Sequence, residues 1–187
     1  MGSRRSLQRA QSTVEFGASA LVLVLLLFGL IDLGRVFYFD VGLQGAAREG
    51  ARQASWFDQG SGTNPTLYDA AILASVNGIL SHDGLPNAVL QNPGTTCPAP
   101  TDGNTIYNPP YVDTTYPAAL NAPSLYICYA NTPGLDLTSA PADNSMKGQD
   151  VNVILVMSFG FVSGFMNGVL GNSVHIVANA HMTIGGY

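Results

Sequence analysis

The chain has 187 residues, of which 47% are hydrophobic and only 10% are charged, whereas an average soluble domain carries about 25% charged residues. This composition excludes an intrinsically disordered chain, and the length allows one domain of ordinary size with an appendage. The net charge is −5, yet six of the seven basic residues precede residue 53, and the remainder carries Lys147 against eight Asp. An acidic body with a basic tip argues against a nucleic-acid partner.

The first element in chain order is an apolar helix. Residues 16–34 form a run of 19 residues in which Asp32 is the only charge. At 1.5 Å per residue the run spans about 28 Å, close to the roughly 30 Å hydrocarbon core of a bilayer. We therefore predict a membrane-spanning segment over about 16–35. The alternative is a cleaved secretory signal peptide, but the run is too long and lacks an Ala-x-Ala site.

Basic residues flank this run on one side. Arg4, Arg5 and Arg9 lie before it, within a leader that we assign to residues 1–12. The positive-inside rule then predicts a single-pass protein of the cytoplasmic (inner) membrane, with its N-terminus inside and its C-terminus outside. Everything after about residue 36 is expected to be exported.

Both cysteines, Cys97 and Cys128, fall on the predicted exported side. In an oxidising compartment an even pair indicates one disulfide bond. Closing a loop of about 31 residues stabilises a fold by roughly 3 kcal/mol in the chain-entropy model. A metal site would need more ligands than these two cysteines and three scattered histidines.

The helix is predicted to continue beyond the membrane, over residues 13–56, because no proline interrupts it before Pro65. Such a helix is roughly 65 Å long. Small residues recur on one face at every fourth position, which indicates close packing against the chain's own head or a neighbouring subunit; they are Gly42, Ala46, Gly50 and Ala54. The alternative is a loosely helical, glycine-rich linker.

Residues 57–187 are predicted to form an exported head. Asn64 as N-cap and Pro65 as first helical residue predict a second helix over about Pro65–Ser81. Its expected inward-facing residues are Leu67, Ala70, Ala71, Ala74 and Ile79. From Asp83 to Lys147 the chain is rich in Pro, Asn and Thr, and only Ser124–Ala130 resembles a strand. Such loops are candidates for recognition.

The C-terminal part is β-structure. Val151–Phe161 is a β-branched run, and Ser173–Ile184 alternates apolar and polar residues with period two, so the two are predicted to pair antiparallel. The connection Val162–Asn172 is unusually apolar and is expected to contact either the chain's own helix or a membrane or neighbouring subunit. The fold class is therefore α+β: a long N-terminal helix followed by a head with a short helix and a small antiparallel sheet.

Catalytic motifs are missing from the sequence. It contains no P-loop, dinucleotide-binding fingerprint or Gly-x-Ser-x-Gly elbow. His175 and His181 would lie about 20 Å apart on one strand, too far to share a metal ion. The stretches 102–104 and 143–144 lack the ligand spacing of a calcium loop. We therefore expect no enzymatic activity, no metal and no cofactor.

Three N-terminal segments together resemble one family. They are Gln11–Phe16 (QSTVEF), Asp32–Arg35 (DLGR) and Ala46–Arg52 (AAREGAR), the first two separated by the apolar run. The combination strongly resembles the TadE-like minor pilins of the tight-adherence (Flp) pilus system, over residues 10–55. The strand, apolar tip and strand at the C-terminus also resemble this family.

This resemblance implies a class III prepilin signal that a prepilin peptidase cuts on the cytoplasmic side. Glu15 falls at the pilin glutamate, fifth in the mature chain, so cleavage would fall between Ala10 and Gln11, where Ala10 replaces the usual Gly. In a filament Glu15 would pair with the new amine of a neighbour's Gln11; alternatively it only favours the helix N-terminus. Asp32 and Arg35 are spaced to pair across one turn, unless Arg35 extends to the headgroups.

The sequence thus predicts a pilin-like structural subunit, a minor pilin or pseudopilin, that acts in pilus assembly or adhesion. Its expected partners are other pilin subunits, the pilus assembly machinery, the prepilin peptidase and the lipid bilayer, and its final location is an extracellular pilus if it assembles. The alternative is a membrane-tethered binding module that does not polymerise. A membrane-anchored hydrolase is disfavoured by the missing motifs.

Overall fold

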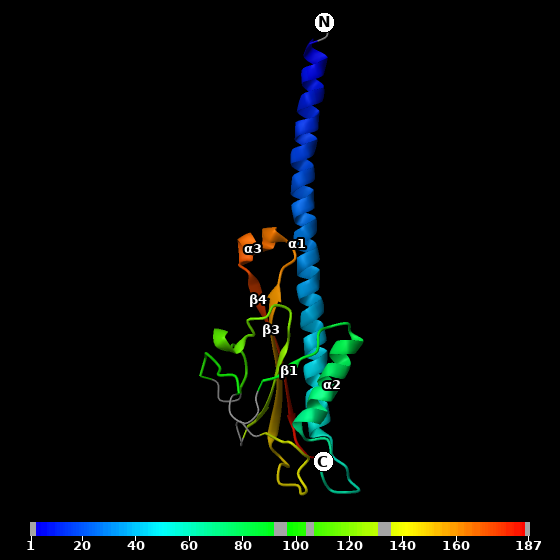
Figure 1. The fold of residues 1–187 in the computed structure, drawn as a ribbon, viewed down its shortest axis with the longest axis vertical. Coiled ribbons are helices and arrows are strands. Elements are labelled where there is room, and N and C mark those ends of the chain that lie inside the picture. Colours follow the sequence, from blue (N-terminus) through cyan, green and yellow to red (C-terminus); the bar gives the residue numbers. More distant parts are fainter. Residues whose placement is uncertain (1–2, 92–96, 104–106, 131–135, 186–187) are drawn as a thin grey trace.

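The computed structural model describes residues 3–91, 97–103, 107–130 and 136–185, with only the backbone for residues 3–10, 165 and 169. The fold is α+β, as predicted: a long helix, two shorter helices and one four-stranded sheet. Figure 1 shows the head lying along the C-terminal half of the long helix, while the N-terminal half extends away from it.

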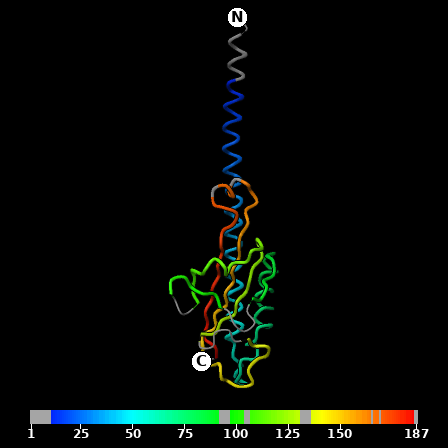
Figure 2. Tube along the Cα trace, turned by 60° about the vertical axis from the view of Figure 1, so that its left-hand side comes forward, coloured from blue at the N-terminus to red at the C-terminus, as the bar shows by residue number. Residues whose placement is uncertain are grey.

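The long helix α1 runs from Ser3 to Ser55, 53 residues, or about 80 Å at 1.5 Å per residue. It ends one residue before the predicted end and begins ten residues before the predicted start. Its second half is buried along one face, where Leu43, Ala47 and Ala51 are fully covered. Its first half carries apolar residues that no other part of the chain covers (Figure 2).

The sheet has the order β1-β2-β3-β4. Its strands are β1 (Val89–Leu90), β2 (Ser124–Tyr129), β3 (Asp150–Gly160) and β4 (Ser173–Thr183). β1 is parallel to β2, whereas the other neighbours are antiparallel. The three predicted strands are confirmed to within one residue at each end, and the short β1 was not predicted.

Both faces of β3 are covered, so only Asp150 at its start is not fully buried. Val153, Leu155 and Met157 belong to the main core with α1, whereas Ile154 and Val156 face a smaller core under the loops. The alternation follows the two-residue period of a strand. This central strand therefore lies between α1 on one face and, on the other, the loops that contain Tyr107, Tyr111 and Tyr116, which we call the loop layer.

Helix α2, Asp69–His82, packs beside α1 and starts later than predicted. Asn64 is not its N-cap: the Asn64 side chain donates a hydrogen bond to the carbonyl of Trp56 (2.7 Å) and so closes the end of α1. The predicted inward face was also wrong in phase, because the larger residues Ile72, Val76 and Leu80 fill the core instead of the alanines. Of the predicted set, Leu67 is fully buried.

Candidate functional site: the long helix and its contacts with the head

The N-terminal half of α1 presents an apolar surface on all sides. Phe16, Leu23 and Leu30 are each about two-thirds or more exposed, and the most apolar window of the helix has no residue buried within the structure. By length and composition, α1 can therefore cross a membrane, and it is the only such helix in the described part of the chain.

Glu15 lies on this bare half, one turn from the predicted mature N-terminus. The side chain of Gln11 donates a hydrogen bond to Glu15 Oε1 at 2.9 Å. The backbone of Ala10 is helical and its side chain lies outside the described residues. The predicted cleavage and filament roles of these three residues remain predictions.

Asp32 is the point at which the apolar half of α1 meets the head. Its carboxylate is 1% exposed and accepts hydrogen bonds from the backbone amides of Val162 (3.0 Å) and Ser163 (3.1 Å) and from the Ser163 hydroxyl (2.5 Å). A buried carboxylate is costly unless it is paired and hydrogen-bonded. These bonds join α1 to residues about 130 positions later in the chain.

The predicted pair between Asp32 and Arg35 is present, with 3.5 Å between Arg35 Nη1 and Asp32 Oδ1. The Arg35 guanidinium also lies 5.0 Å from the ring centroid of Phe159 in β3, a cation–π geometry. Arg35 therefore contacts the head. The sequence predicted this pair, and a contact of the connection Val162–Asn172 with the chain's own helix was one of its two alternatives. It did not predict that Val162 and Ser163 are the main partners of Asp32.

The stripe of small residues on α1 is covered by the head of the same chain. Ala46 and Ala54 are fully buried. A Cβ added at Gly42 would lie 2.3 Å from Leu85, and one at Gly50 would lie 2.6 Å from Val76. Both distances are too short for a real contact, so the absent side chains let α2, the loop that follows it and β3 approach α1 closely. The structure thus favours packing within the chain over a flexible linker.

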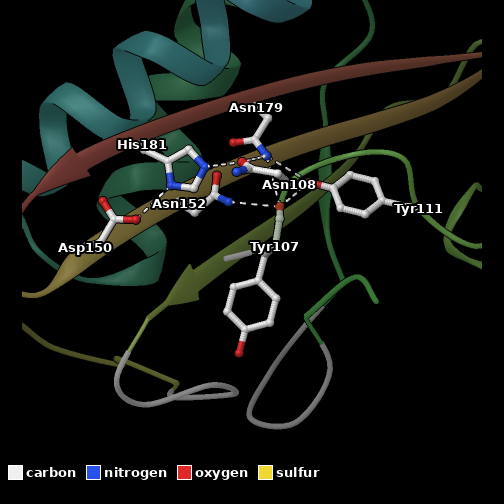
Figure 3. Close-up of polar contacts among 7 residues, drawn as sticks. All are labelled: Tyr107, Asn108, Tyr111, Asp150, Asn152, Asn179 and His181. Atoms are coloured by element: carbon white, nitrogen blue, oxygen red, sulfur yellow. Dashed lines mark hydrogen bonds and ion pairs between the residues drawn. The ribbon is translucent and has the colours of Figure 1, made fainter. Parts of the chain in front are cut away.

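A polar cluster fastens the loop layer to the outer face of the sheet. The carbonyl of Tyr107 accepts hydrogen bonds from Asn152 of β3 (3.1 Å), Asn179 of β4 (3.0 Å) and the Tyr111 hydroxyl (2.5 Å) (Figure 3). Burial raises the pKa of Tyr111 above its usual range. Sequence reasoning missed this cluster, because its centre is a backbone carbonyl.

His181 extends the same cluster toward the end of the sheet. Its Nδ1 lies 2.7 Å from Asp150 Oδ2, and its Nε2 lies 2.5 Å from Asn108 Oδ1. His175, on the same strand, instead stacks on the ring of Tyr116 with centroids 3.8 Å apart. The two histidines thus hold different parts of the loop layer. Within the described residues, no group of three or more His, Cys, Asp or Glu is placed to hold a metal ion.

The two cysteines meet beneath the same loops. Cys97 and Cys128 are joined, with 2.10 Å between their sulfurs and 31 positions between them in the sequence. Cys128 is fully buried in β2, in the small core with Tyr111 and Ile154. The bond therefore attaches the loop layer to the sheet within this small core.

A buried carboxyl, that of Asp69, lies at the start of α2 next to the exposed Asp136. Burial, followed by the hydrogen bond to the Asp136 carboxyl, raises the pKa of Asp69 to about 7. Burial also raises the pKa of the nearby Tyr129 hydroxyl, and that hydroxyl has no hydrogen-bond partner among the residues that the structure describes. A buried carboxyl beside a second carboxyl group keeps its proton to a higher pH than an isolated, exposed one.

These features define an α+β protein whose head is built along a helix that is long and apolar enough to cross a membrane. Residues 10–52 match the family of TadE-like proteins. The match covers the three N-terminal segments named above and confirms the resemblance there; it does not extend to the C-terminal hairpin. Comparison with curated proteins and with solved structures gave no match.

Proposed function

We propose that this chain is a pilin-like structural subunit of a tight-adherence type pilus, without enzymatic activity, that acts in assembly of the pilus or in adhesion. One observation carries the proposal: the TadE-like segment, residues 10–52, contains the whole bare apolar half of α1. The family match and the uncovered surface thus coincide in one element.

The uncovered surface needs an apolar environment. Burial of apolar surface is worth about 25 cal/mol per Å², and helix residues from Val14 to Ile31 include many large side chains left exposed. A bilayer satisfies this need before assembly, and the helices of neighbouring subunits satisfy it in a filament. The same surface therefore supports both a membrane-anchored state and an assembled state.

The charges support the orientation with the N-terminus inside. Arg4, Arg5 and Arg9 precede the apolar run, and the disulfide-linked head follows it. Cytoplasmic positive charge and an oxidising exterior are consistent with this arrangement. The prepilin peptidase would then reach the Ala10–Gln11 bond from the cytoplasmic side.

Cleavage would place a new amine one helical turn from Glu15. In a filament this carboxylate would pair with the Gln11 amine of a neighbouring subunit, since a charge within an apolar helix bundle requires a partner. Within one chain the Gln11 side chain already donates to Glu15, so the same carboxylate accepts a hydrogen bond before assembly.

The test is incorporation into filaments in cells with an active pilus system. We expect the chain in the sheared extracellular fraction, with Gln11 as its N-terminal residue by mass analysis. Glu15→Ala should abolish incorporation and leave membrane levels unchanged. Glu49→Ala is the matched control, because Glu49 is a glutamate of the same helix that forms an exposed pair with Arg52.

Two outcomes contradict the proposal. A chain that stays in the membrane fraction, while other pilins are sheared off, indicates a tethered binding module that does not polymerise. A mature N-terminus at Met1 or Gly2 in the presence of the cognate peptidase rejects the processing step alone, and the membrane helix would survive that result.

A further inference from the structure

We propose that the hairpin tip between β3 and β4, residues 161–172, enters the outer leaflet of the bilayer and acts as a second membrane contact. The tip includes helix α3, Gly164–Leu170. This inference rests on the membrane-embedded α1 of the proposed function, but not on pilus assembly.

The position of the tip along α1 is fixed by Asp32. Hydrogen bonds from Val162 and Ser163 hold the start of the tip at this residue, and the Met166 sulfur lies 3.8 Å from the place of a Cβ on Gly29. Figures 1 and 2 both place α3 beside α1, at the end of the head nearest the N-terminus. The tip therefore lies beside residues that belong to the predicted span.

The depth of the tip in the bilayer follows from the geometry of α1. If the span ends at Arg35, Asp32 lies about 4.5 Å and Gly29 about 9 Å inside it, at 1.5 Å per residue. Interfacial helices bury their apolar face roughly 5–10 Å into the headgroup and acyl boundary. The tip thus reaches the depth at which an interfacial helix contacts acyl chains.

The composition of the tip suits this depth. Residues 161–172 contain no charged side chain, and Val162 and Leu170 are 75% and 52% exposed. The backbone amides that open the tip are hydrogen-bonded to Asp32, and the Ser163 hydroxyl caps the Met166 amide. Satisfied backbone groups are the condition for entering hydrocarbon.

A groove between α1 and the tip can accommodate lipid acyl chains. It has a volume of about 450 Å³ and is lined by Leu25, Phe28 and Ile31 of α1 and by Val162 and Gly164 of the tip. The groove is continuous with the bare apolar surface of α1, so the lipid that surrounds the helix also reaches the groove. Lipid acyl chains are therefore the occupant that we assign to it.

The experiment uses the single tryptophan of the full chain. Trp56 is replaced by Phe, and one new tryptophan is placed at Leu170 or, in a second variant, at Val162. Each protein is reconstituted into phosphatidylethanolamine–phosphatidylglycerol vesicles with lipids brominated near the headgroup or near the chain end. We expect lipids brominated near the headgroup to quench both tip tryptophans about twofold, as for an interfacial helix, and aqueous iodide to have little effect.

Three controls make the result specific. Leu21→Trp, in the bare half of α1, should be quenched by the lipids brominated near the chain end. Val89→Trp, at a position of β1 that is 61% exposed, should respond to iodide and not to lipid. Trp56 in the unmodified chain should behave like Val89→Trp, because it lies about 32 Å along α1 from Arg35.

The proposal is overturned if both tip tryptophans respond to iodide and not to lipid while Leu21→Trp is quenched by lipid. It is also overturned if both tip tryptophans are shielded from iodide and from brominated lipid, and become accessible to these quenchers only when the protein is diluted into excess lipid. In that case a second copy of the chain would cover the tip. Failure of Leu21→Trp to contact lipid would reject the membrane anchor itself. Failure of the shearing test alone would leave the tip proposal standing.

Discussion

Gly50 and Gly45 provide a paired test of how closely the head packs on α1. Both glycines lie in the same helix, yet a Cβ at Gly50 would lie 2.6 Å from Val76, 3.1 Å from Val153 and 3.5 Å from Ile72, whereas one at Gly45 would lie 4.0 Å from Ile79. Gly50→Ala therefore introduces a methyl group into occupied space, and Gly45→Ala introduces one at an ordinary contact distance.

The magnitudes separate the two variants. Replacing Gly by Ala in a helix gains about 1 kcal/mol of intrinsic propensity at either position. Overpacking a well-packed core costs about 1–3 kcal/mol, and this cost applies only at Gly50, where the neighbours are stiff, buried, β-branched side chains. Gly45→Ala should thus stabilise the chain by up to about 1 kcal/mol, and Gly50→Ala should leave its stability unchanged or reduce it by up to about 2 kcal/mol.

The assay is thermal unfolding of the full chain in detergent with the disulfide intact. At about 2–4 °C per kcal/mol for a fold of this size, the two midpoints should differ by about 2–12 °C, with Gly45→Ala higher. Gly50→Leu should lower the midpoint further, whereas Gln53→Leu, three positions along the helix, should change it less. Equal midpoints for the two alanine variants would refute the close approach at Gly50.

Three further predictions concern the other contacts of the head. Asp32→Leu should release the tip from α1, because it leaves the Val162 and Ser163 amides without acceptors at a cost of about 1–3 kcal/mol each. Hydrogen exchange of these two amides should accelerate at least tenfold, and unchanged exchange would contradict the attachment of the tip to Asp32. Replacing both Cys97 and Cys128 by Ala should cost roughly 3 kcal/mol of unfolding free energy, measured by denaturant titration, and two alkylatable thiols in native protein would contradict the bond. Because the pKa of Asp69 is about 7 in the fold against about 3.9 in an unfolded chain, the folded state retains a proton that the unfolded state loses, so the unfolding free energy should fall as pH rises from about 4 to about 7. Asp69→Asn should flatten that decline, and an unchanged slope would assign it to another group.

The long elements could be predicted because their patterns are local. The continuous apolar run and the absence of proline predicted α1, and the period-two alternation of Ser173–Ile184 predicted β4. The small residues at every fourth position predicted a packed face before any partner was known. In each case, the residues that specify the element lie within the element itself.

The contacts that position the site depend on distant residues, and this is why the sequence did not reveal them. Asp32 accepts a hydrogen bond from Ser163, 131 positions away, and no local sequence pattern predicts such a contact. The start of α2 was wrong for a similar reason: Asn64, a good N-cap by type, is used to close α1, and the Asp69 amide bonds instead to the carbonyl of Leu137. Tertiary contacts here override the local capping preference.

Asp32 explains why a charged residue is retained near the end of an apolar helix. Leucine at this position would suit the lipid, but it would leave the amides of Val162 and Ser163 without acceptors at the same depth. The carboxylate accepts hydrogen bonds from both amides and pairs with Arg35, so its own charge is compensated at the start of the tip. In the proposed membrane-anchored state, the depth of α1 and the position of the head would therefore be coupled through Asp32, and a shift of the helix along its axis would carry the tip with it.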